Sequence, residues 1–242
     1  MKKATPFFML FGELGRLPIE LIIYRRMVCY WARLLSGKNS KLSTLLYKVM
    51  LNDYIVNGTE YKWVITIKNI LENLGMGNVW VAHTFRSVNC LSQQIKQRQT
   101  DQYSQTWRSN ISLSSRGKTY QLYKEQLILE KYINILPEKL WKPLLKFRTS
   151  NHYLPVETGR WNNISFEDRI CTLCHESEIG DEFHYLFTCH FFSNSRTQFL
   201  HPYYYTRPNT YKFKELMQNK RISTLKNLAK FIKVIMNVFK CP

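Results

Sequence analysis

Residues 171–189 read CTLCHESEIGDEFHYLFTC and hold three of the six cysteines of the chain. Cys171 and Cys174 are separated by two residues, and His184 and Cys189 by four. The two-residue spacing lets two thiolates of one tight turn reach a single ion, and the second pair can complete a tetrahedron from the far side of a loop. The spacing therefore predicts a structural Zn²⁺ site with Cys171, Cys174, His184 and Cys189 as ligands.

Other interpretations of this stretch stay open. His175 and His190 each adjoin a ligand cysteine and could serve in place of His184. Small buried cysteines that pack together, or a redox-active CxxC pair, would need no metal. If a metal binds, four protein ligands leave no position for water, so its role would be structural. Asp181 is placed to cap a short helix that carries His184, and the last turn of this helix is expected to loosen at Thr188.

The remaining cysteines are not predicted to be ligands. The N-terminal residues lack the pattern of a secretory signal, so we expect reduced thiols and no disulfides. The uncharged runs are too short to span a bilayer, and no membrane partner is expected. Packing or exposed thiols are predicted for Cys29, Cys90 and Cys241.

Apolar residues recur at helical spacing through most of the chain. They predict a mostly α fold, with a helical bundle-like N-terminal part, a small zinc-knuckle-like segment and C-terminal basic helices. Helices are expected over residues 18–37, 40–58, 63–75, 87–115 and 222–240.

A domain boundary is predicted where the helical period is lost. From Phe147 to Trp161 the sequence FRTSNHYLPVETGRW contains Pro and Gly and shows no apolar period. We therefore expect a helical, thumb-like or linker region over residues 1–146. A zinc-binding-like segment with a basic helical tail is expected over residues 147–242.

Positive charge indicates a polyanion partner. The chain has 35 Lys+Arg against 17 Asp+Glu, a formal net charge of +18. Lysine and arginine attract phosphates, and neighbouring aromatic rings can stack on unpaired bases. A membrane-surface helix over residues 222–240 is the rival interpretation. Nucleic acid, RNA or DNA, is favoured, with the candidate contacts Arg148, Arg160, Trp161, Lys212, Lys214, Lys226, Lys230 and Lys233.

Catalysis is not expected. The four aspartates are scattered, whereas two-metal phosphoryl transfer needs several convergent carboxylates. The sequence also lacks a phosphate-cradling glycine loop, a G-x-S-x-G motif and an H-E-x-x-H motif. A structural role for His152, in its loop-like block, is favoured over a catalytic one.

Several blocks resemble one known family. LLKFRTSNHYLPVETGRW (144–161), RICTLC, GDEFHYLFTC and HFFSNSR look like the C-terminal region of reverse transcriptases from non-LTR retrotransposons. The segment GELGRLPIELIIYRRMVCYWARLLSGKNSKLS (12–43) resembles the part just upstream. In that family a zinc-binding-type segment follows the polymerase. The resemblance implies the ligand set Cys171, Cys174, His184 and Cys189, and places in the preceding block Arg148, Asn151, His152, Arg160 and Trp161.

The resemblance also sets limits on the expected function. The paired catalytic aspartates of the polymerase and the endonuclease domain are missing from this sequence, so the chain is expected to be a detached tail without polymerase activity. The resemblance implies a nuclear or cytoplasmic location, nucleic acid as a partner and, as a second partner, the polymerase part of the same element. A zinc-shaped protein-interaction module and a non-functional remnant are the alternatives.

Overall fold

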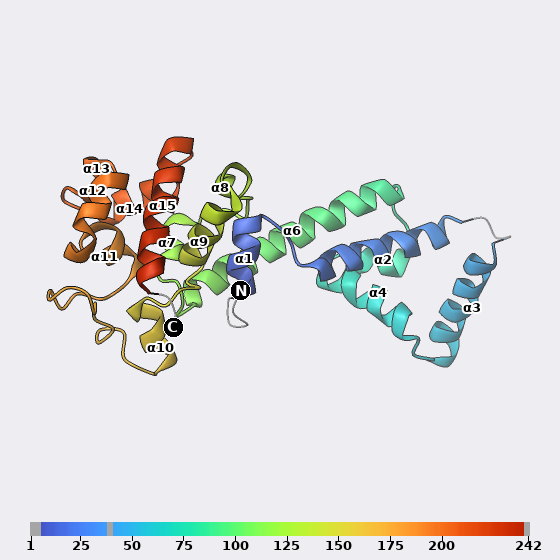
Figure 1. Ribbon diagram of the computed structural model, residues 1–242. Coiled ribbons are helices and arrows are strands. Elements are labelled where there is room, and N and C mark those ends of the chain that lie inside the picture. The colour runs from blue at the N-terminus through green and yellow to red at the C-terminus, as the bar shows by residue number, and fades with distance from the viewer. Residues whose placement is uncertain (1–5, 38–40, 240–242) are drawn as a thin grey trace. The chain divides into compact units, whose positions relative to one another are not determined.

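The computed structural model describes residues 6–37 and 41–239, whose regular structure is mostly helical (Figure 1). No strand forms over these residues, and none of their helices has the length and apolar character needed to cross a membrane. The mostly α fold is thus confirmed. The elements are α1 (Phe7–Leu14), α2 (Ile19–Leu35), α3 (Leu42–Asn57), α4 (Lys62–Asn73), α5 (Gly77–Ala82), α6 (Val88–Leu113), α7 (Tyr120–Tyr123), α8 (Lys131–Ile135), α9 (Glu138–Arg148), α10 (Pro155–Trp161), α11 (Glu182–Phe187), η1 (His190–Phe192), α12 (Ser193–Phe199), α13 (Pro202–Tyr205), α14 (Thr210–Met217) and α15 (Ile222–Val238).

Helix ends follow the expected signals. Pro18 precedes the first residue of α2, where its fixed φ suits a helix start. Gly58 ends α3 in the left-handed region with φ 68°, a conformation that glycine adopts without steric cost. The helix expected over residues 222–240 is confirmed as α15, and Lys240 lies outside the described residues.

The described chain divides into two compact units. Unit 1 holds the described part of residues 1–16 and 107–242, and unit 2 holds that of residues 17–106. This division differs from the boundary predicted between residues 146 and 147. The physical reason is that α9 spans this position and packs along α15, so residues before and after it share one core.

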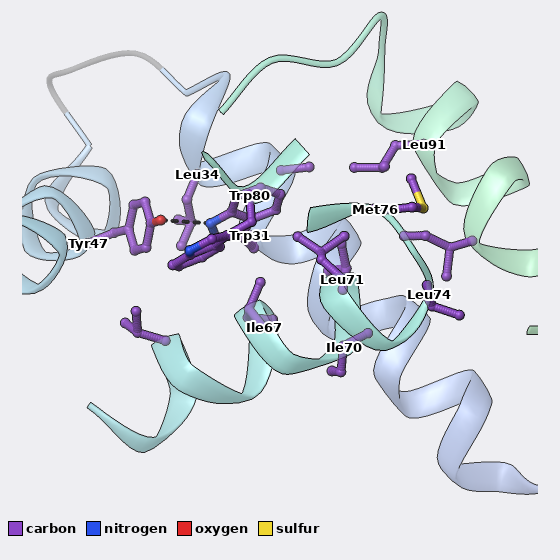
Figure 2. Close-up of a cluster of buried hydrophobic side chains, with 14 residues drawn as sticks. Trp31, Leu34, Tyr47, Ile67, Ile70, Leu71, Leu74, Met76, Trp80 and Leu91 are labelled. Atoms are coloured by element: carbon purple, nitrogen blue, oxygen red, sulfur yellow. Dashed lines mark hydrogen bonds between the residues drawn. The ribbon is translucent and has the colours of Figure 1, made fainter. Parts of the chain in front are cut away.

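Unit 2 has its own apolar core, in which α2, α3, α4 and α5 meet (Figure 2). Trp31 of α2 is fully buried, and its indole N–H donates to the hydroxyl of Tyr47 on α3 at 2.7 Å. The rings of Trp31 and Trp80 stack with centroids 5.7 Å apart, while α4 contributes Ile67 and Leu71. One indole thus meets an aromatic partner from each of α3 and α5.

A buried ion pair holds the helices of unit 1 together. Arg148, only 2% exposed, donates from Nε and Nη2 to the carboxylate of Glu13 on α1, at 2.7 and 3.0 Å. Its Nη1 donates to the carbonyl of Met217 at 2.7 Å, and the Tyr132 hydroxyl donates to Glu13 at 2.6 Å. The prediction that Arg148 contacts nucleic acid is therefore wrong, because the guanidinium is enclosed by protein and out of reach of a phosphate.

Both members of this pair stay charged. Burial alone would raise the pKa of Glu13, but the Arg148 guanidinium holds that pKa below its ordinary value. Burial alone would lower the pKa of Arg148, but Glu13 raises it well above the usual range. Removing one partner would therefore leave an uncompensated charge in the interior.

Replacing Arg148 is expected to destabilise the protein strongly. Arg148→Met should lower the free energy of unfolding in urea by about 3–5 kcal/mol, because Glu13 would keep its burial and lose its counter-charge. Glu13→Gln combined with Arg148→Met should cost less than the sum of the single changes. Arg108→Met, at an exposed position on α6, should stay within about 0.5 kcal/mol of the wild type. A loss below about 1 kcal/mol for Arg148→Met would show that the pair is not needed for the fold.

Candidate metal centre

Cys171 and Cys174 lie in a small hairpin. Its strand-like arms meet at the antiparallel bridge between residues 170 and 179, and the Cys171 N–H donates to the carbonyl of Glu178 at 2.8 Å. Inside the loop the Leu173 N–H donates to Cys171 Sγ at 3.4 Å. A backbone donor aimed at sulfur bends the chain into the tight turn that a two-residue spacing requires, so both thiols face one point.

The hairpin ends at Gly180, where side chains of α10 and α11 come close to the backbone. A Cβ added there would lie 2.8 Å from Pro155 Cγ and 2.8 Å from the Tyr185 hydroxyl. Both distances are shorter than real side chains tolerate, so only glycine fits between α10 and α11 without a shift. The close approach of α10 and α11 at this point therefore depends on a residue without a side chain.

The second pair of donors comes from α11 and the residues just after it. Asp181 Oδ1 accepts a hydrogen bond from the His184 N–H at 2.8 Å, which confirms the predicted N-terminal cap of the helix. The helix ends at Phe187, and Thr188 is its C-terminal cap. Cys189 follows and is fully buried.

The four donor atoms of Cys171, Cys174, His184 and Cys189 lie within 4.8 Å of one another. Cys171 Sγ is 3.9 Å from Cys189 Sγ, and Cys174 Sγ is 3.4 Å from His184 Nε2. Tetrahedral bonds to zinc of about 2.3 Å (S) and about 2.0 Å (N) would place two sulfurs about 3.8 Å apart, and sulfur and nitrogen about 3.5 Å apart. The residues therefore fit a tetrahedral metal ion.

His184 is the fourth member of the cluster. The other two candidates point elsewhere, since His175 is exposed and the exposed His190 pairs with Glu176 at 2.9 Å. The Thr188 hydroxyl lies 2.8 Å from His184 Nδ1, which leaves Nε2 toward the sulfurs. A partner on the second ring nitrogen is the usual device that fixes the tautomer of a ligating histidine.

Burial shifts the pKa values of two of the thiols and of the imidazole in opposite directions. Burial raises the pKa of the Cys189 thiol to about 12, and burial also raises the pKa of Cys174. Burial lowers the pKa of His184, which keeps its imidazole neutral and its lone pair available. A cation bound here would have to displace thiol protons.

A buried arginine supports the cluster from behind. Arg196 on α12 donates from Nη2 to the Cys189 carbonyl at 2.7 Å and from Nε to the Leu186 carbonyl at 2.8 Å. It thereby closes the C-terminal end of α11 against α12. Arg196 is the last residue of the HFFSNSR block, but no role was predicted for it. The supporting role of Thr188 was not predicted either, although its place four residues after His184 puts both on one helix face.

The remaining cysteines that the structure describes take no part in the cluster. Cys29 is buried in α2, and Cys90 is half-buried in α6, consistent with the packing role predicted for them. Cys241 lies outside the described residues.

Three of the predicted nucleic-acid contacts form an exposed stripe. Lys226, Lys230 and Lys233 lie on the outward side of α15, at offsets of 0, 4 and 7. Within the part of the chain that the structure describes, none of them makes an ion pair. Their charges are therefore open to a partner.

The other predicted contacts are partly engaged by the protein. Arg160 donates to the buried carboxylate of Glu157 at 3.1 Å, and neighbouring Trp161 packs edge-on against a tyrosine ring. Lys212 donates to the Thr206 carbonyl at 2.5 Å, and Lys214 pairs with Glu125. The structure thus leaves α15 as the stronger candidate surface.

Loss of one ligand is expected to abolish metal binding. Cys189→Ser should remove the bound ion, whereas Cys90→Ser should keep one ion per chain, measured by native mass spectrometry of reduced protein with added Zn²⁺ and again after a chelator. Metal affinity should fall as the pH is lowered, because the Cys189 thiol, with its raised pKa, must lose its proton to bind. Equal metal content in both variants would contradict the assigned ligand set.

Two substitutions of Asp181, the N-cap residue of α11, distinguish the contribution of its hydrogen bond from that of its charge. Burial, with Glu182 nearby, raises the pKa of Asp181 to about 7. Asp181→Ala should cost about 1 kcal/mol of unfolding free energy, whereas Asp181→Asn keeps the cap. Because the raised pKa means that stability is lost as pH rises from about 4 toward 7, Asp181→Asn should gain on the wild type between about pH 4 and about pH 7. Equal losses for the two variants, in urea titrations of metal-loaded protein, would refute the capping role.

Known proteins provide no closer guide to this site. Comparisons with protein-family models, with curated proteins and with solved structures found no match. The four-donor cluster and the exposed lysines are therefore the features of this chain that indicate a function.

Proposed function

We propose that this chain is a non-catalytic module that binds RNA or DNA and that a structural zinc ion holds its C-terminal part in shape. The lysine stripe of α15 carries the proposal. Lys226, Lys230 and Lys233 are exposed, and α15 contains no acidic residue that could neutralise them. A row of unpaired cations along a rigid helix attracts a phosphate backbone and releases its counterions.

A second helix adds to this charge. α9 packs along α15 and carries Lys139, Lys142 and Lys146 on its exposed side, at offsets of 0, 3 and 7. Lys142 pairs with Glu138, and the other two make no ion pair among the described residues. Two neighbouring helices thus carry lysines toward solvent, which supports a phosphate-binding surface larger than the α15 stripe alone.

Zinc would supply stability where packing is thin. Cys171 is the only buried residue between positions 161 and 179. A segment with so little core needs a cross-link, and three thiolates with one imidazole are a donor set typical of structural zinc. Four protein donors also leave no coordination position for a reacting water, which favours a structural role.

The metal would also hold the lysine helix in place. Cys189 accepts a hydrogen bond at its carbonyl from Arg196 of α12, and α12 packs on α15. A ligand, a buried arginine and two helices therefore connect the cluster to the stripe. This connection, and the resemblance of residues 144–196 to reverse transcriptase tails, supports one module in which zinc shapes a nucleic-acid-binding surface. The polymerase part of such an element would be a second partner.

Salt dependence tests the proposal. Fluorescence anisotropy with a labelled single-stranded RNA, and separately with duplex DNA, should show affinity that falls by at least about tenfold between about 50 and about 200 mM salt. For single strands, the triple change of Lys226, Lys230 and Lys233 to Gln should lower the slope of log affinity against log salt by about 2, since each lost contact removes about 0.7.

A matched triple variant provides the control. Changing Lys41, Lys48 and Lys62 to Gln removes the same charge from exposed positions of unit 2 and should leave most of the affinity. Equal losses in both triple variants would reject α15 as the binding surface. An affinity indifferent to salt, or no binding by folded metal-loaded protein, would reject the proposed function.

Protein binding is a second candidate function, because unit 2 leaves apolar residues uncovered. Leu42, Val49 and Val56 of α3 are between 65% and 70% exposed. Exposed aliphatic side chains on one helix are typical of a surface that meets another protein.

A further inference from the structure

Helix α3 is apolar on more sides than its own unit can cover. Its inward side places Tyr47 against Trp31, with Thr44 also buried. A helix that is apolar all round is normally buried all round. Its outward side is instead between 46% and 70% exposed at Leu42, Leu45, Leu46, Val49 and Val56.

The exposed residues form one stripe. Their offsets along α3 are 0, 3, 4, 7 and 14, which is the spacing of one helix face. The same spacing on a partner is what an amphipathic helix uses when it lies in a groove. The described residues form no strand that could take up an extended peptide by edge pairing, so a helix is the fitting shape.

A groove runs beside this stripe, between α2, α3 and α4. It has a volume of about 360 Å³ and adjoins the stripe at Leu46. Aromatic rings form much of its wall, since Trp63 meets Tyr30 at 6.1 Å and Tyr47 at 5.9 Å between centroids. The aliphatic part of its lining includes Leu34, Leu46 and Met50.

The charge beside the groove selects the partner. Arg26 and Arg33 are exposed on α2, four residues before and three residues after Tyr30, and therefore share its helix face. Asp53 lies three residues after Met50 and stays charged, because hydrogen bonds from Tyr61 and Asn57, each at 2.6 Å, hold the pKa of its carboxyl below the ordinary value. The two arginines outnumber this aspartate, so the charge beside the groove is positive and an acidic partner complements it.

We propose that the groove between α2, α3 and α4 binds an amphipathic helix of a partner protein, with apolar residues on one face and acidic residues beside them. The stripe and the aromatic wall would take the apolar face, and Arg26 and Arg33 would meet the carboxylates. A second copy of this chain fits less well, because two chains of charge +18 repel each other. This site lies within unit 2 and does not depend on the nucleic-acid surface of unit 1.

A designed peptide tests the proposal on the full chain. The probe is a fluorescent helical peptide with leucines at i, i+3, i+4 and i+7 and glutamate or alanine elsewhere. It should bind in an anisotropy titration, and a peptide of the same composition with scrambled order should bind at least about tenfold more weakly. A version with lysine in place of glutamate should also lose at least about tenfold.

Surface variants locate the binding. Leu46→Glu puts a charge at the groove edge and should weaken binding by at least about tenfold, whereas Leu113→Glu, at an 84% exposed position of unit 1, should change it less than about twofold. Arg26→Glu with Arg33→Glu should weaken the acidic peptide and strengthen the lysine version. Circular dichroism confirms that each variant is folded.

Three results would overturn the proposal. These are equal binding of the scrambled peptide, equal losses for Leu46→Glu and Leu113→Glu, and a concentration-dependent dimer that Leu46→Glu abolishes. The last would mean that a second copy covers the groove. RNA affinity of Leu46→Glu should equal that of the wild type, so failure of the groove and failure of the nucleic-acid surface give different results.

Discussion

The charge pair of Glu13 and Arg148 is the constraint around which unit 1 is built. Its two groups come from α1 and α9, and they also engage Tyr132 of α8 and the Met217 carbonyl of α14. A charge inside a protein is tolerated only when every bond to it is in place. Four helices must therefore meet correctly at one point, which gives this part of the fold a specificity that apolar packing alone does not provide.

The four-donor cluster lies in another part of unit 1, where local hydrogen bonds position the donors. Cys171 and Cys174 belong to a hairpin that buries little apolar surface, and the residues before it are mostly exposed, whereas α11 is buried at Tyr185, Leu186 and Phe187. Asp181 and Arg196 bind the backbone around the donors and Thr188 contacts the His184 ring, by hydrogen bonds of 2.7–2.8 Å. Because the protein positions these groups itself, an ion would find its ligands already gathered and would spend little binding energy on ordering them.

Local patterns in the sequence predicted the fold class, the main helices and the ligand spacing. Helical periodicity and end signals work for α2, α4 and α15 because each has a clear apolar face and a short-range start or stop. Cys171, Cys174, His184 and Cys189 were found because a metal site imposes spacing on the chain. Helical periodicity also predicted that Lys226, Lys230 and Lys233 lie on one side of α15.

Features that depend on distant partners could not be predicted. Arg148 was assigned to the surface because nothing near it in the sequence reveals Glu13. The helix α10 was missed because Pro155 and Gly159 weaken its pattern, while tertiary contacts such as Gly180 against Pro155 stabilise it. The division into two units differs from the predicted boundary at residue 147 for the same reason, since α9 is continuous through it and packs on α15.

The number of residues between Glu13 and Arg148 also determines when their ion pair can form during synthesis. Glu13 and Arg148 are 135 residues apart, with the whole of unit 2 between them. At a synthesis rate of about 5–20 residues per second, Glu13 is made about 7–27 s before its partner. Unit 2, which has its own core, can fold in that interval. During synthesis Glu13 of α1 therefore lacks its counter-charge until α9 has been made.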